Sequence, residues 1–215
     1  LDGKPVSLLD LLRYAIGNLI VYGPLRNVLG MSRIRAAYTA GKAVDPGATI
    51  VTGGLAPDGD LNQNPTNPRH PLNYIMGMYF SGAHGYFDAI GHHPYPPAPF
   101  SPLTGGASAL GWNSFQYTKR IYAIMKTFGD GKKKIWGTET GAATGACSGC
   151  VSEARQSRWL KDEYRRWVSW TFTGPLFWHA GRDDKTGGPA KDQNYGLLRS
   201  DFTQKPAYAT ATNLW

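Results

Sequence analysis

Cysteine, glutamate and charged residues in general are scarce in this sequence. Only two cysteines are present, and charged residues make up 18% of the 215 positions. Paired zinc knuckles need four ligands, so two cysteines do not indicate a structural zinc site. The hydrophobic share of 41% is that of an ordinary globular chain and excludes a disordered one. The length suffices for a domain with a core of its own.

Long apolar runs are also lacking. The most apolar stretch, residues 6–22, is short for a membrane span and is interrupted by Asp10 and Arg13. It predicts an amphipathic helix, so we expect residues 1–31 to form an atypical, helical N-terminal lead and no membrane-spanning segment. No signal peptide opens the chain, although a removed one would leave no trace.

The two cysteines, Cys147 and Cys150, lie in a C-S-G-C stretch. A thioredoxin-type site would open a helix after a strand of its own fold, and the surrounding sequence does not fit that fold. The pattern favours a local loop disulfide formed in an oxidising compartment, with two free thiols as the alternative. We therefore expect a secreted or cell-envelope protein.

The net charge of +8 does not come from one basic tract. The densest cluster is Lys132–Lys134, and no nucleic-acid-binding motif accompanies it. We interpret the charge as a solvated basic surface and expect no nucleic-acid partner, the alternative being a preference for an acidic polysaccharide. Glycine-rich phosphate-binding motifs are absent as well, which argues against a nucleotide-binding sheet.

Strand and helix signals alternate after residue 30, which indicates an α/β fold. Strands are predicted at 48–54, 87–93, 133–140 and 173–180, and helices at 32–44, 71–83, 112–128 and 152–168. A further short apolar segment at 195–198 precedes a final helix opened by Lys205 and Pro206. Strand–helix units at so regular a period predict a parallel sheet with right-handed crossovers.

Polar and aromatic residues gather just after each predicted strand. In a (β/α)8, or TIM, barrel the active site lies at these carboxyl ends. A complete barrel needs about 250 residues, and only four units follow residue 47. We therefore expect a partial barrel, with residues 32–215 supplying strands five to eight.

Only three glutamates occur in the chain, at 139, 153 and 163. Glu153 and Glu163 fall on the predicted helix 152–168, where solvation explains them. Glu139 lies in I-W-G-T-E-T-G, at the end of a strand that begins apolar, and is the candidate for catalysis. His92 and His93 lack a third ligand at convincing spacing, so no metal site is predicted, and nothing implies a cofactor.

The segment I-W-G-T-E-T-G-A-A-T-G resembles the nucleophile strand of the retaining (β/α)8 glycosidases. Residues 85–97, 45–57, 174–184 and 194–208 resemble the sixth, fifth and eighth strand regions and the closing segment of bacterial family 39 and family 5-like members. These include cellulase-like and exopolysaccharide-degrading enzymes. The resemblance covers about residues 35–210 in the right order, and it implies a TIM-barrel glycosidase.

The resemblance also implies roles for individual residues. Glu139 corresponds to the nucleophile that forms a glycosyl-enzyme, Tyr95 to the tyrosine that hydrogen-bonds it, and His93 to the histidine of the same subsite. Trp178 corresponds to the tryptophan under the cleaved sugar, the alternative being a core residue. His92, Trp136 and His179 complete the expected substrate-binding set. The alternative for His92 and His93 is that both are strand-end histidines hydrogen-bonded to the backbone.

The expected acid/base residue of such an enzyme is missing. Retaining glycosidases need a second carboxyl group about 5–5.5 Å from the first, and residues 1–138 contain no glutamate. Loop aspartates such as Asp183 are interpreted as turn formers or solvated. The sequence thus predicts a retaining, cellulase-like endo-β-glycosidase acting on a polysaccharide, weak or inactive in this truncated form. The alternative is a non-catalytic carbohydrate-binding or assembly module, paired with a second copy or a complementing half-barrel.

Overall fold

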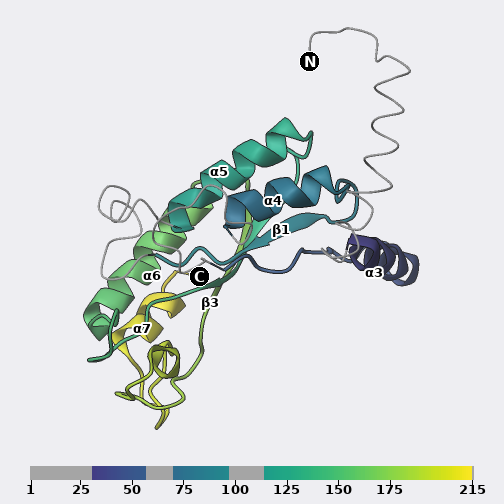
Figure 1. The fold of residues 1–215 in the computed structure, drawn as a ribbon. Coiled ribbons are helices and arrows are strands. Elements are labelled where there is room, and N and C mark those ends of the chain that lie inside the picture. Colours follow the sequence, from purple (N-terminus) through teal and green to yellow (C-terminus); the bar gives the residue numbers. More distant parts are fainter. Residues whose placement is uncertain (1–30, 57–69, 97–113, 215) are drawn as a thin grey trace, which may run out of the picture. The chain divides into compact units, whose positions relative to one another are not determined.

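The computed structural model describes residues 31–56, 70–96 and 114–214 (Figure 1). The helices are α3 (Met31–Val44), α4 (Pro71–Phe80), α5 (Ser114–Thr127), α6 (Glu153–Val168) and α7 (Pro206–Thr212), and the strands are β1 (Ala89–His92), β2 (Lys134–Thr140) and β3 (Thr173–Trp178). The chain forms two compact units, one of residues 1–50 and 76–87 and one of residues 51–75 and 88–215. The helix predicted within residues 1–31 lies outside the described residues, apart from its last position.

The first unit contains α3, the last five residues of α4 and the loop that ends at residue 87. Tyr38 and Arg35 of α3 both meet Tyr86, through an edge-on ring contact at 6.1 Å and a cation–π contact at 5.1 Å. Helix α3 ends at Val44 and a turn follows it, in which the Gly47 amide donates to Asp45 Oδ1 at 2.9 Å. This bond from the backbone to a polar side chain stabilises the turn.

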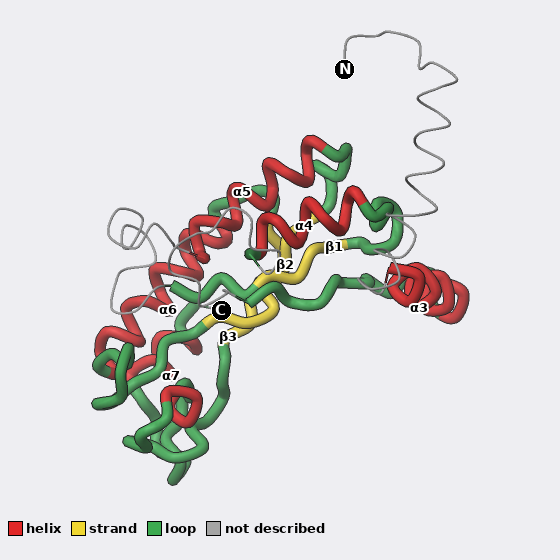
Figure 2. Tube along the Cα trace, viewed as in Figure 1, coloured by secondary structure: helices red, strands yellow, loops and turns green. Residues whose placement is uncertain are grey.

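The second unit is built on a parallel sheet of order β1-β2-β3 (Figure 2). Ile90 of β1 pairs with Ile135 of β2, which pairs with Thr173 of β3. The predicted strand at 48–54 is reduced to two isolated parallel bridges, Val51 to Ala89 and Leu55 to His92. The neighbouring segments therefore follow one another in chain order, as in a series of βα units, while the strand numbering of a complete barrel remains a proposal.

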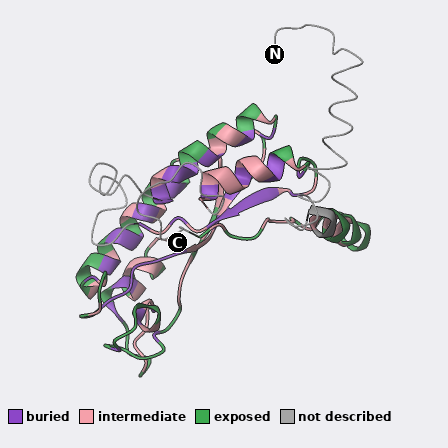
Figure 3. Cartoon of the chain, in the orientation of Figure 1, coloured by how far each residue is buried: buried purple, intermediate pink, exposed green. Residues whose placement is uncertain are grey.

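Helices α5 and α6 bury apolar stripes within this unit (Figure 3). The stripe of α5 includes Phe115, Ile121 and Met125, all without exposed surface. Trp167 of α6 packs near Phe115, with ring centroids 6.2 Å apart, and its indole N–H donates to Gly174 O at 2.7 Å. Burial at this 3–4 residue spacing is what makes short amphipathic helices stable on a sheet.

The second unit's sheet carries an irregularity that decides which way β2 side chains point. A Cβ at Gly137 would lie 3.2 Å from Trp167, and Thr140 Oγ1 lies 2.8 Å from Glu163 Oε2 on the same helix, so both positions face α6. Strict alternation would put residues three apart on opposite faces. The register between β2 and β3 shifts between Gly137 and Thr140, and such a shift accommodates the extra residue. Glu139 is thereby directed away from the helix.

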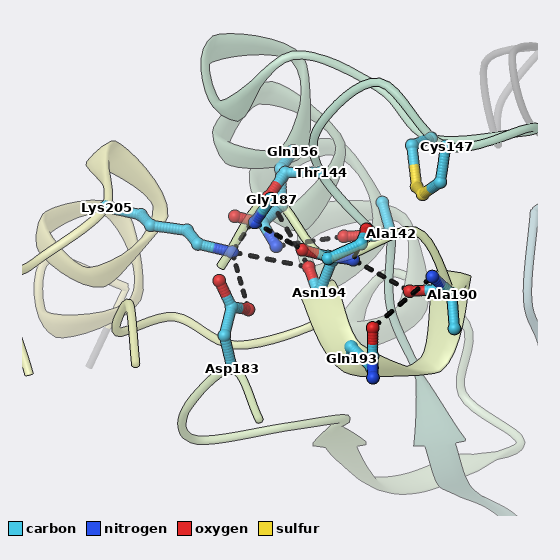
Figure 4. The surroundings of a disulfide bond; sticks show 12 residues. Ala142, Thr144, Cys147, Gln156, Asp183, Gly187, Ala190, Gln193, Asn194 and Lys205 are labelled. Atoms are coloured by element: carbon cyan, nitrogen blue, oxygen red, sulfur yellow. Dashed lines mark hydrogen bonds and ion pairs between the residues drawn. A yellow bond between two sulfur atoms is a disulfide. The ribbon is translucent and has the colours of Figure 1, made fainter. Parts of the chain in front are cut away.

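The loops after β2 and β3 are joined by a buried lysine (Figure 4). Lys205 Nζ donates to Asp183 Oδ1 at 2.7 Å, to Thr144 Oγ1 at 2.8 Å and to Asn194 O at 3.3 Å. Neither Lys205 nor Asp183 has exposed side-chain surface. The interpretation of Asp183 as a turn former or solvated aspartate is therefore wrong, because sequence position alone does not reveal a buried cation.

A disulfide joins Cys147 and Cys150 in the loop after β2. The loop is closed on itself by hydrogen bonds from Val151 N to Ala143 O at 2.8 Å and from Gly145 N to Val151 O at 3.1 Å. This arrangement is the local bridge that the cysteine spacing favours over free thiols. In the described ranges, no helix is long and apolar enough to span a membrane.

Candidate active site

Glu139 lies at the centre of a group of polar side chains at the carboxyl end of the sheet. The Tyr95 hydroxyl donates a short hydrogen bond to Glu139 Oε1. His93 Nδ1 lies 3.3 Å from Oε2, and His179 Nδ1 lies 3.6 Å from Oε1. Because 32% of the Glu139 side chain stays exposed, the carboxylate remains open to an incoming molecule.

Parallel strands place these residues together. His93 and Tyr95 follow β1, Glu139 is the next-to-last residue of β2, and His179 follows β3. The carboxyl ends of neighbouring parallel strands meet at one edge, so residues 44 positions apart in sequence come within hydrogen-bonding distance. The His179 amide in turn donates to Thr140 O at 2.7 Å, which ties the β3 end to the Glu139 strand.

The two tyrosines of the site are held in their neutral form. Burial raises the pKa of Tyr95 far above its ordinary value, and the hydrogen bond to Glu139 and its negative charge raise it further. Burial, together with the charges of Glu139 and Asp192, raises the pKa of Tyr195 to about 12. Tyr95 is therefore a permanent hydrogen-bond donor to the carboxylate at every physiological pH.

His93 is a neutral ring rather than a fixed cation. Burial lowers its pKa, an effect that the Glu139 charge opposes and the neighbouring His179 reinforces. A neutral imidazole next to a carboxylate does not cancel the charge of that carboxylate. The negative charge on Glu139 is thus kept available for reaction.

Gly54 allows the His93 ring to occupy its position. A Cβ on Gly54 would lie 2.0 Å from His93 Nε2 and 2.6 Å from Thr138 Oγ1. Real side chains never approach so closely, so any larger residue would displace the ring from Glu139. A Cβ on the preceding residue, Gly53, would meet nothing within 4 Å.

The other two glutamates have different environments. Glu153 forms a bidentate ion pair with Arg199, at 2.9 Å to Nε and 2.5 Å to Nη2. Glu163 is completely buried on α6, so its interpretation as a solvated helix residue is wrong. The sequence carries a signal for this burial, because Glu163 continues the 3–4 spacing of the buried residues Gln156, Trp159, Leu160 and Trp167.

His92 does not join the group around Glu139. Its ring has no exposed surface and lies between two carbonyl oxygens, with Nε2 3.0 Å from Ser114 O and Nδ1 3.2 Å from Leu55 O. Burial lowers its pKa to about 4, so the ring is neutral at pH 7. The structure gives His92 the backbone-bonded role that was the alternative to the predicted sugar contact.

The two candidate tryptophans lie on opposite faces of the sheet. Trp178 packs against Ala142, Val151 and Trp159, beside its register partner Thr140, and so faces α6. Trp178 is thus the core residue that was the alternative to the predicted position under the cleaved sugar, and its contacts are with this core and not with Glu139. Trp136 lies over Gly174 on the face away from Trp167, with Phe177 at 6.3 Å, and its predicted sugar contact remains a prediction.

Tyr195 belongs to the site although the sequence did not single it out. Its ring centroid lies 5.7 Å from that of Tyr95 and 5.3 Å from that of His179. A Cβ on Gly141 would approach its ring to 3.1 Å. A tyrosine that follows a polar loop has no periodic signal, so only the folded loop after β3 reveals it.

Among the described residues, no group of three or more His, Cys, Asp or Glu could hold a metal ion.

Comparison with solved structures relates this fold to glycoside hydrolases. A family 39 glycoside hydrolase from Bacteroides cellulosilyticus WH2 matches with a TM-score of 0.65 and 25% identity over 83% of this chain. A family 2 β-galacturonidase from Eisenbergiella tayi matches at 17% identity over 60% of the chain, with a TM-score of 0.44 too low to carry an argument. No protein-family model and no curated protein matches the sequence.

The family 39 match supports the relationship to glycosidases that the sequence motifs indicated. The chain spans 36% of the length of that enzyme. The activity of the whole glycosidase is therefore not transferred to this chain with the fold.

Proposed function

We propose that this chain is a retaining glycoside hydrolase unit with Glu139 as its nucleophile. The observation that carries the proposal is the set of side chains around one partly exposed carboxylate: Tyr95 donates to Oε1, His93 lies near Oε2 and His179 lies beside Oε1. Of the three glutamates, Glu163 is buried and the partly exposed Glu153 is engaged by Arg199, which leaves Glu139 as the better candidate for contact with a substrate.

The reaction proceeds by displacement at the anomeric carbon. A Glu139 oxygen forms a bond to C1 as the bond from C1 to the leaving oxygen breaks, and the leaving oxygen departs with the electron pair. Water then attacks C1 as the bond from C1 to Glu139 breaks, which releases the sugar and restores the carboxylate. The proton that the water loses passes through solvent to the oxygen of the leaving group. Tyr95 and His93 hold the carboxylate in position, and Tyr95 has no tendency to ionise and compete with it.

We further propose a polysaccharide substrate cut internally, in the manner of a cellulase-like endo-β-glycosidase. The sequence resemblance supports this class. Trp136, which is partly buried, and Phe177, which is 50% exposed, offer apolar ring surface on the sheet face opposite α6. Sugar rings stack on such surfaces. The disulfide is consistent with action outside the cytoplasm, in a secreted or cell-envelope setting.

The missing acid/base residue limits the proposed activity. General acid–base assistance contributes about 10²–10⁴-fold to such reactions, and residues 1–138 offer no glutamate for it. Substrates with poor leaving groups should therefore turn over slowly in this chain alone. Aryl glycosides with good leaving groups need no proton and should still react once with Glu139.

Covalent trapping tests the proposal. The protein is incubated with activated 2-fluoro-glycosides of several sugars, digested and analysed by mass spectrometry. We expect one adduct on the peptide with Glu139, and none in Glu139→Gln. Glu153, which is also partly exposed, is an internal control for non-specific esterification. An unmodified Glu139 after long exposure to every reagent would overturn the nucleophile assignment.

A second candidate function is that of a non-catalytic carbohydrate-binding or assembly module. The sheet described here has three strands and is open at β3, and an exposed edge tends to pair with another chain. A second copy or a complementing half-barrel could cover it. Light scattering distinguishes the candidates, because a module of this kind should be a dimer or hetero-complex and a stable monomer contradicts it.

A further inference from the structure

A buried carboxyl group lies directly behind the proposed nucleophile. Glu163 of α6 has no exposed surface, and its Oε2 lies 2.8 Å from Thr140 Oγ1. Its Oε1 has no hydrogen-bond partner within the described part of the chain. A fully ionised carboxylate with one orphaned oxygen is unfavourable in a protein interior. The mechanism proposed above makes no use of this group.

The contacts of Thr140 connect Glu163 to both strand ends of the site. Thr140 Oγ1 also lies 3.3 Å from the carbonyl oxygen of Pro94. Thr140 follows Glu139 in the chain, and Pro94 precedes Tyr95. The Thr140 hydroxyl group therefore connects the strand that carries Glu139 with the loop that carries Tyr95.

The Thr140 hydroxyl group has only one hydrogen to donate, and two possible acceptors lie next to it, the Glu163 carboxylate and the Pro94 carbonyl oxygen. When Glu163 is ionised, Thr140 donates to the carboxylate, and the Pro94 carbonyl loses its donor. When Glu163 is protonated, the carboxyl O–H donates to Thr140, whose own hydrogen is free for Pro94. The relay from Glu163 through Thr140 to Pro94 is complete only in the protonated state.

We propose that Glu163 is a positioning residue, whose neutral carboxyl group completes the relay and so fixes the spacing of Glu139 and Tyr95. The inference rests on the proposed role of Glu139 for its effect on reaction, but the relay itself does not. Glu163 touches no substrate and acts only through Thr140. A misplacement of about 1 Å at a reacting group is enough to reduce a rate about 10²-fold.

The electrostatic surroundings agree with a neutral Glu163 at pH 7. Burial raises its pKa to about 8, the neighbouring Asp162 on α6 adds to this, and the hydrogen bond from Thr140 opposes it. Across the sheet, the charge of Glu163 also raises the pKa of Tyr95, which stays neutral throughout. Toward β3 and α7, the cavity beside Thr140 is lined by non-titrating residues, namely Leu176, Trp178, Leu197, Ala211 and Leu214, and by Tyr164 of α6.

The first test follows the rate of covalent labelling of Glu139 against pH. In the natural protein we expect the rate to fall about tenfold as pH rises through about 8, because the relay opens. Glu163→Gln supplies a neutral donor at every pH and should remove this alkaline decline. Thr140→Val should lower the rate at all pH values, and Thr140→Ser should restore it. Glu153→Gln, on the same helix, should leave the profile unchanged.

A second readout keeps the two proposals separate. The ¹³Cζ chemical shift of Tyr95, assigned with Tyr95→Phe, reports its hydrogen bond without any substrate. We expect a titration with a midpoint of about 8 in the natural protein and none in Glu163→Gln. If Glu139 is never labelled but this shift titrates, the glycosidase proposal fails and the relay stands. An identical labelling profile or an identical titration in Glu163→Gln overturns the positioning role.

Discussion

Tyr95 and Glu139 stand 44 residues apart in sequence, and the hydroxyl group of the first donates directly to the carboxylate of the second. The bond crosses from the loop after β1 to the end of β2. It exists because the two strands are parallel neighbours, with Ala89 in register with Lys134. The same bond holds a single carboxylate oxygen in one orientation and leaves the other for His93.

Removing the hydroxyl group of Tyr95 should therefore impair Glu139. A hydrogen bond to a charged group contributes about 1.5–3 kcal/mol, so Tyr95→Phe should slow covalent labelling by roughly 10- to 100-fold. Tyr122→Phe is the matched control, because its hydroxyl group donates to Gly131 O at 3.1 Å, away from the carboxylate. Mass spectrometry of timed samples gives both rates, and equal rates in the two variants would contradict the assigned contact.

The sequence predicted the parts of this site that depend on local pattern. Apolar strand cores and the strand-end positions of Glu139, His93 and His179 follow from alternation and from turn residues, and the structure brings those three together. The strand predicted at 48–54 forms only isolated bridges in the structure. Its β-branched residues indicate an extended backbone, but they do not show whether that backbone is hydrogen-bonded to a neighbouring strand.

Other errors arose where a side chain's direction depends on tertiary structure. The register shift after Gly137 turns Thr140 toward α6, and no sequence period reveals such a shift. Trp178 was placed at the sugar by the family resemblance, whereas in the structure it lies on the same face of β3 as Leu176 and packs in the core, which was the alternative. Glu163 and Asp183 were assigned to solvent because carboxylates are usually exposed, and their burial depends on Thr140 and Lys205, far away in sequence.

Adding one methyl group at Gly54 should disturb the site. The new Cβ would overlap His93 and Thr138, so Gly54→Ala should destabilise the fold by about 1–3 kcal/mol and move His93 away from Glu139. Gly53→Ala provides the control, because its Cβ has open space. Urea unfolding and the labelling rate measure the two effects. Similar unfolding free energies and labelling rates for the two variants would contradict the close contact between Gly54 and the His93 ring.

His92 should make the protein sensitive to acid. Its pKa is lowered to about 4 by burial, against an ordinary value of 6.5, so the unfolded chain takes up a proton that the folded chain resists. The stability from this group is fully present above pH 6.5 and is lost as pH falls through about 4. Ring-proton NMR of His92, with urea unfolding across the same pH range, checks the prediction. A His92 midpoint near 6.5 would contradict the buried, carbonyl-bonded ring.

The ion pair between Lys205 and Asp183 should be the most sensitive electrostatic contact outside the site. Both side chains are fully buried, so Lys205→Met leaves the Asp183 charge uncompensated and should destabilise the fold by about 3–5 kcal/mol. The partly exposed pair of Glu153 and Arg199 is the comparison, and Glu153→Gln should change stability far less, because water screens this pair. Urea unfolding followed by tryptophan fluorescence gives both values. The double variant with Asp183→Asn should recover part of the loss, because no lone charge remains; a double variant no more stable than Lys205→Met would show that packing, and not charge, holds these loops together.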